Sequence, residues 1–78
     1  MIDVKLMPLL AKRAASKKEQ LAVAFHSGLT PAAVAESEGF HGADLDPLLA
    51  VVNGSQVELD SQLADGDRLE LMIGIAGG

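Results

Sequence analysis

The 78-residue sequence contains no cysteine, tryptophan or tyrosine, and its only aromatic side chains are those of Phe25 and Phe40. The lack of cysteine excludes disulfides, thiolate metal sites and thiol nucleophiles. The scarcity of aromatic residues means that the core is built from Leu, Val, Ile and Ala, which supply most of the 49% hydrophobic fraction. A chain of this length buries only about 60% of its unfolded surface. We therefore expect one small domain with a single core.

Long hydrophobic runs are also lacking. The longest uninterrupted aliphatic stretch is Leu48–Val52, whereas a membrane-spanning helix needs about 20 apolar residues. The first residues, "MIDVKLMPLL", alternate and include Asp3 instead of following the basic-then-apolar pattern of a signal peptide. We therefore expect a cytoplasmic protein that does not bind membranes.

Positive charge is scarce outside the first 18 residues. Residues 1–18 hold five basic residues against one acid, a net charge of +4, and residues 19–78 hold ten acids against Arg68, a net charge of −9. A mostly acidic chain is a poor ligand for nucleic acid, whose phosphates require a basic surface. It suits docking on a basic protein surface instead.

The first third of the chain has the pattern of two strands around a short helix. Residues 2–6 alternate between apolar and polar side chains, as in a half-buried strand. Pro8 occupies a permitted first helical position, which predicts a short helix over residues 8–15. The apolar positions of residues 19–25 step by two and predict a second strand, although a single helix over residues 9–25 is the competing interpretation.

The middle of the chain has the clearest helix signal. Thr30 is a good N-cap, Pro31 fits the first turn, and Gly39 can adopt the left-handed conformation that ends a helix. Residues 41–49 are expected to form an irregular crossing segment in which Leu45 and Leu48 pack on the core.

The pattern of the last third of the chain predicts three strands joined by tight turns. Asn53–Gly54 is a strong two-residue hairpin signal between strand-like runs. Residues 65–67, "DGD", predict another turn, in which Asp65 and Asp67 act as caps. The strand that follows places Leu69, Leu71 and Ile73 on one face.

The order of these elements is strand, strand, helix, strand, strand, strand. The simplest way to bury the apolar faces of the first and last strands is to set them side by side at the sheet centre. We therefore predict an α+β protein of the β-grasp (ubiquitin-like) class, with a mixed sheet of four to five strands packed on one main helix. Residues 1–73 would form the domain, and residues 74–78 a flexible tail containing the terminal Gly-Gly.

The chain ends in "LMIGIAGG". A terminal carboxylate becomes an acyl donor when it attacks the α-phosphate of ATP and forms an acyl adenylate. Because Gly77 and Gly78 have no side chains, they can pass a narrow channel and leave the terminal carbonyl unhindered. Ile75 and Ala76 would give the tail apolar contacts with a partner, and Gly74 would provide flexibility where the strand ends.

Four segments together resemble the MoaD/ThiS family of ubiquitin-like sulfur carriers over essentially the whole chain. They are the opening "IDVKLM", "VVNG" at residues 51–54, "LADGDRLEL" at residues 63–71, and the terminal "GG". The resemblance implies that an adenylating enzyme of the MoeB/ThiF type uses ATP to activate Gly78. It also implies that a thiocarboxylate formed on Gly78 then donates sulfur in cofactor biosynthesis. The chain itself would bind no cofactor and have no catalytic residue beyond Gly78.

The long segment between the first two strands, residues 7–25, resembles the small subunit of molybdopterin synthase. This resemblance implies that the acceptor is a molybdopterin synthase large subunit, and we expect a monomer when the chain is free. A thiamine-pathway carrier or another sulfur carrier is an alternative within the family. Two further alternatives are a modifier that transfers Gly78 to a lysine amine, and a non-covalent β-grasp binding module.

Other charged and metal-ligating residues carry weaker signals. His26 and His41 lack nearby ligands at a suitable spacing, so no metal site is expected. Glu58 and Glu70 are expected near the base of the tail, where they could meet basic residues of the activating enzyme.

Overall fold

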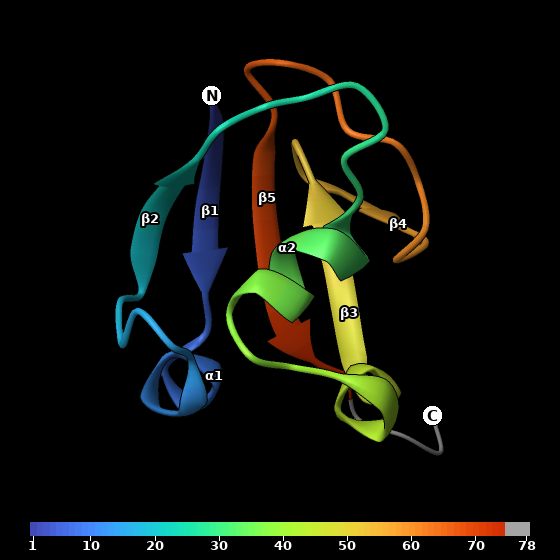
Figure 1. The fold of residues 1–78 in the computed structure, drawn as a ribbon. Helices are drawn as coiled ribbons and strands as arrows, with labels where there is room; N and C mark the ends of the chain where they lie inside the picture. The colour runs from blue at the N-terminus through green and yellow to red at the C-terminus, as the bar shows by residue number, and fades with distance from the viewer. Residues whose placement is uncertain (75–78) are drawn as a thin grey trace.

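A five-stranded mixed sheet forms the frame of the molecule, and a computed structural model describes it for residues 1–74. The elements along the chain are β1 (Ile2–Leu6), α1 (Pro8–Arg13), β2 (Gln20–Val23), α2 (Pro31–Ser37), the 3₁₀ helix η1 (Gly42–Leu45), β3 (Leu48–Val52), β4 (Ser55–Val57) and β5 (Arg68–Ile73). The strand order across the sheet is β2-β1-β5-β3-β4, and α2 lies across one face (Figure 1).

The first and last strands are neighbours at the sheet centre, as predicted. Strands β1 and β5 run parallel, with Val4 opposite Leu69, whereas the other three pairings are antiparallel. Alternation along β1 turns Ile2, Val4 and Leu6 towards the core, where each is at most 2% exposed. Burial of one face of both central strands therefore fixes their register, since a slip by one residue would expose every apolar side chain.

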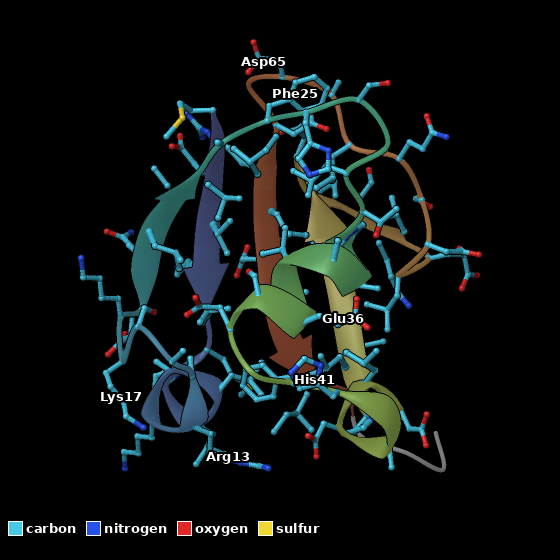
Figure 2. All side chains as sticks on the ribbon, in the orientation of Figure 1. Arg13, Lys17, Phe25, Glu36, His41 and Asp65 are labelled. Carbon is cyan, nitrogen blue, oxygen red and sulfur yellow. The ribbon has the colours of Figure 1, made fainter. Side chains whose placement is uncertain are left out.

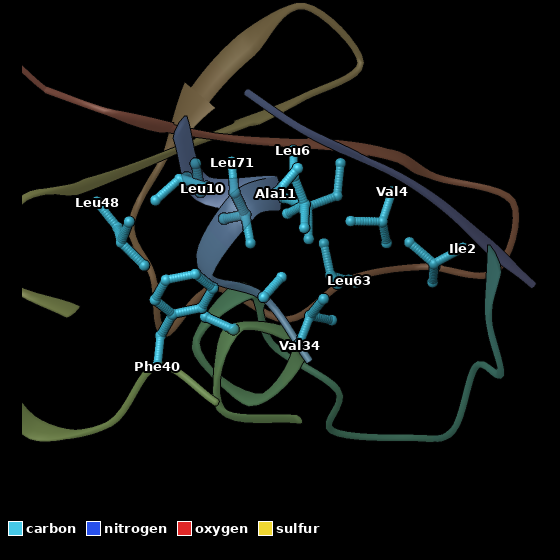
Figure 3. Packing of buried hydrophobic residues seen from close by; sticks show 14 of the residues in the cluster. Ile2, Val4, Leu6, Leu10, Ala11, Val34, Phe40, Leu48, Leu63 and Leu71 are labelled. Atoms are coloured by element: carbon cyan, nitrogen blue, oxygen red, sulfur yellow. The ribbon is translucent and has the colours of Figure 1, made fainter. Parts of the chain in front are cut away.

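The core lies between the sheet and α2, and Figure 3 shows how side chains from both layers meet in it. Helix α2 contributes Val34 and Ala35, and Phe40 follows just after the helix; all three are almost fully buried. The predicted helix signals are confirmed. The Thr30 hydroxyl accepts a hydrogen bond from the Ala33 amide at 3.1 Å, and Gly39 has a φ of +97°.

Residues 20–23 form the predicted strand, and the competing long helix is wrong. Helix α1 ends at Arg13, and Ala14 has an extended backbone conformation (φ −71°, ψ 151°). Lys17 then adopts a positive φ of 58°, which turns the chain back towards the sheet. Helix α1 is consequently two residues shorter than predicted, and the Glu19 carbonyl accepts a hydrogen bond from the Leu6 amide at 2.8 Å at the start of β2.

Glu38 is the buried charged side chain of the described residues, at 7% exposure. Its carboxylate accepts hydrogen bonds from both the backbone amide and the hydroxyl of Ser16, and its carbonyl accepts one from the Ala15 amide. These bonds hold the segment between α1 and β2 against the end of α2. The segment before β3, expected to be irregular, contains η1, and Leu48 already belongs to β3.

At the end of the sheet away from α1, two turns are joined through side chains. The Asn53 side chain accepts a hydrogen bond from the Arg68 amide at 3.0 Å and donates one to the Asp67 carboxylate at 2.9 Å. Asp67 also accepts from the Ala64 amide at 2.8 Å and so caps its own turn as predicted. Asp65 instead forms an ion pair with the amino terminus of Met1.

Among residues 1–74, no helix has the length and hydrophobicity that crossing a membrane would need.

Candidate functional site: the root of the carboxyl-terminal tail

The end of β5 is where the chain leaves the sheet, and it lies between two other strands. Beyond the end of β1, the Met7 amide donates a hydrogen bond to the Leu71 carbonyl at 3.1 Å. The Ile73 amide lies 3.1 Å from the sulfur of Met7. On the other side of β5, Ile73 pairs with Leu48 of β3. The chain therefore reaches Gly74 from the central strand of the sheet, at the end where α1 and η1 lie (Figure 1).

Gly74 is held in place by two contacts. Its amide donates a hydrogen bond to the Pro47 carbonyl at 2.7 Å, which continues the pairing of β5 with the chain before β3. A Cβ atom on Gly74 would lie 2.8 Å from Cγ of Leu49, closer than real Cβ contacts come. Sequence reasoning assigned Gly74 a role in flexibility, but this residue is hydrogen-bonded and packed. The structural reason for glycine here is the close approach of Leu49.

Substitution of Gly74 by Ala is expected to destabilise the domain by about 1–3 kcal/mol, because the added methyl group must displace the Leu49 side chain. The measurement is the free energy of unfolding from urea denaturation. In a double-mutant cycle, Leu49→Ala should relieve part of this cost and give a coupling energy of at least about 0.5 kcal/mol. Additive effects of the two substitutions would contradict the steric explanation.

The other predicted tail residues, Ile75, Ala76, Gly77 and Gly78, lie outside the described residues. Their proposed roles in partner contact and activation stay predictions.

Apolar side chains are exposed around the root of the tail. Ile73 is 38% exposed and Leu9 of α1 is 58% exposed, and Met72 is half-buried on the opposite face of β5 from Leu71. Ile73 follows the alternation predicted for the buried face, but the strand ends there and leaves the side chain partly in water. Because successive side chains of a strand alternate, Met72 and Ile73 lie on opposite faces of the sheet.

The open face of the sheet, opposite α2, carries charges of both signs in a shallow depression. Asp3 of β1 pairs in register with Arg68 of β5, and Lys5 with Glu70. Glu58, by contrast, follows β4 at the far edge of the sheet. The two glutamates that the sequence analysis placed near the tail are therefore apart, since Glu70 is on β5 with Lys5 as a basic neighbour and Glu58 lies in the segment after β4.

Residues with acid–base or metal-binding chemistry do not gather at the root. Within residues 1–74, no three His, Asp or Glu side chains are placed to hold a metal ion. The amino terminus of Met1 lowers the pKa of Asp65, chiefly by a hydrogen bond and also by its positive charge. Asp65 is at the opposite end of the molecule from α1 and the end of β5 (Figures 1 and 2). Within the described residues, the root therefore offers no acid–base or metal-binding site.

The sheet order, the central parallel pair and the single main helix on one face define a β-grasp, ubiquitin-like fold. The chain is similar in structure to SAMP1 from Haloferax volcanii, whose crystal structure superposes with a TM-score of 0.72. The match covers 99% of this chain and 98% of SAMP1 at 22% sequence identity, which establishes the fold. No protein-family model matches the sequence, and no curated protein matches it either.

Proposed function

We propose that this chain is a ubiquitin-like carrier protein whose Gly78 carboxylate is adenylated by a partner enzyme and converted to a thiocarboxylate that donates sulfur. The observation that carries the proposal is the position of Gly74. It leaves the central strand at an apolar, partly exposed end of the sheet, four residues before the terminal glycine.

The chemistry requires no catalytic side chain from the carrier. The Gly78 carboxylate attacks the α-phosphorus of ATP, and the β- and γ-phosphates leave together as pyrophosphate. A persulfide of an enzyme then attacks the acyl carbon, AMP leaves, and an acyl disulfide joins Gly78 to the enzyme. A second thiol of the enzyme attacks the enzyme-side sulfur of this bond, which releases the thiocarboxylate on Gly78 and leaves a disulfide on the enzyme. In this scheme the ATP and its binding site belong to a MoeB/ThiF-like enzyme, and this chain supplies the acyl group and the surface that positions it.

The short distance between Gly74 and Gly78 sets a condition on the partner. Four residues span at most about 14 Å when fully extended. An enzyme whose active site reaches Gly78 must therefore come close to the root of the tail, where Leu9, Met72 and Ile73 offer apolar surface.

Within this proposal, the molybdopterin pathway is the specific assignment we favour, with the large subunit of molybdopterin synthase as acceptor. The support is the length of the segment between β1 and β2, which resembles the molybdopterin branch of the family. A second candidate is protein modification, in which the same adenylate is attacked by a lysine amine. The ubiquitin-like fold that this chain shares with SAMP1 is compatible with this candidate.

The test is the intact mass of the protein isolated from its own cells, compared with a sample incubated with an adenylating enzyme, ATP and a sulfur donor. The expected result is a mass gain equal to replacement of one oxygen by sulfur, localised to Gly78 by fragmentation. A lysine-linked adduct without the thiocarboxylate would favour the modifier. An unchanged mass with an enzyme that activates another carrier would overturn the sulfur-carrier proposal.

A further inference from the structure

A second surface lies at the outer edge of the sheet, where a groove runs between the end of β4, η1 and the start of α2. Its floor is apolar and includes Leu48, Leu49, Val57 and Leu59. None of the roles proposed for the tail uses this groove. It is nevertheless next to the root, because Leu49 is also the side chain that Gly74 approaches closely.

Strand β4 pairs with a shorter part of β3 than β5 does, and Leu48 at the unpaired end is only 5% exposed. Pairing between β3 and β4 stops at Ala50 opposite Val57, whereas pairing between β3 and β5 continues to Leu48 opposite Ile73. The Pro47 carbonyl and the Asn53 amide both bond towards β5. In an antiparallel ladder, the residues between such positions point their backbone groups to the other side. Leu48 therefore directs its amide and carbonyl towards the side that β4 no longer covers.

The rim of the groove is acidic. It carries Asp46, Glu58 and Asp60, all of them exposed. In the part of the chain that the structure describes, the ion pairs are those of Asp65 with the amino terminus and Asp44 with Arg13, so none involves a rim residue. No lysine or arginine is among the residues that line the groove.

We propose that this groove binds an extended segment of a partner protein in which apolar side chains are flanked by lysine or arginine. The apolar residues of the groove would contact the apolar side chains of the segment, and the three carboxylates would attract its cations. The inference goes beyond the proposed function, because it does not depend on the chemistry of Gly78.

The test is an NMR titration of the ¹⁵N-labelled protein with an acetylated and amidated pentapeptide, Lys-Val-Arg-Val-Lys. Saturable shifts are expected at residues 45–49 and 56–60, and they should weaken as salt is added. The peptide Glu-Val-Glu-Val-Glu should give no such shifts. The double variant Glu58→Lys/Asp60→Lys should bind the basic peptide about tenfold more weakly, since both substitutions reverse an attractive charge.

Glu36→Lys is the matched control, because Glu36 is exposed on α2 and does not line the groove (Figure 2). Its affinity for the basic peptide should stay within about twofold of the unmodified protein. The proposal is overturned by shifts centred on the open face around Lys5 and Glu70, by the absence of saturable shifts, or by equal weakening in Glu36→Lys. A chain lacking Gly77 and Gly78 should bind the peptide with unchanged affinity. Failure of the chemistry proposed for Gly78 would therefore leave the result of this titration unaffected.

Discussion

Deletion of Gly77 and Gly78 is expected to abolish ATP-dependent activation of the chain while leaving the fold intact. The deletion moves the terminal carboxylate to Ala76, about 7 Å back along an extended chain, and adds a Cβ beside the reacting carbonyl. A reacting group misplaced by even 1 Å can cost about 100-fold in rate, so activation should fall by at least about 100-fold. The measurement is ATP–pyrophosphate exchange catalysed by the activating enzyme.

The fold should not change, because all the buried residues of the core cluster lie between Ile2 and Leu71. The thermal midpoint of the shortened chain is the control, and it should match that of the full chain. Gly78→Ala, which keeps the length and adds one methyl group, is the matched variant and should lose less activity than the deletion. Normal exchange by the shortened chain would contradict Gly78 as the activated residue, because the chain would then be adenylated at another terminus. Absence of exchange with the full chain, despite an enzyme that activates another carrier, would favour a non-covalent binding module.

Substitution of Leu71 by Ala is expected to cost about 2–5 kcal/mol of unfolding free energy. Leu71 is 1% exposed in β5, opposite Leu6 in β1 and Ala50 in β3. A chain of 78 residues is typically stable by roughly 4–12 kcal/mol, so this one substitution removes a large share of the total. The measurement is the midpoint of urea unfolding, monitored by circular dichroism. The dependence of the unfolding free energy on urea concentration (the m value) should stay the same as in the unmodified protein.

Leu9→Ala is the control for this substitution, since Leu9 is 58% exposed. It should change the unfolding free energy by no more than about 0.5 kcal/mol. Equal losses of unfolding free energy for Leu71→Ala and Leu9→Ala would contradict the assignment of Leu71 to the buried core. A loss of partner binding in Leu9→Ala, with stability unchanged, would show that the exposed apolar side chains serve docking.

Most of the fold is readable from the sequence because its signals are local. The alternation of Ile2, Val4 and Leu6 predicts β1, and the cap and stop residues of α2 predict its bounds. The central pairing of β1 with β5 also follows, because two strands with strongly apolar faces are buried most simply when they lie side by side at the sheet centre. Sequence alternation decided correctly between strand and helix for residues 20–23, even though alanine, leucine and lysine favour helix.

The features that sequence reasoning missed are contacts between residues far apart in the chain. Asn53 and Asp67 were each assigned to their own turns, but the structure joins them by a side-chain hydrogen bond. Glu38 gave no signal of burial, and its partner Ser16 is 22 residues away. At Gly74 the steric approach of Leu49 was invisible for the same reason, since it depends on the three-dimensional packing of two strands. Each of these contacts forms only when distant parts of the chain come together in the fold.

The position of β5 also has a consequence for incomplete chains. Strands β1 and β3 contact each other only through β5, so a chain cut before Arg68 has two facing strand edges with no partner between them. Such a fragment cannot close the sheet, and its open edges favour aggregation or degradation. The residues that lead to the tail are thus the same residues that complete the domain. Under the proposed function, a partner that binds the tail would therefore meet only complete domains.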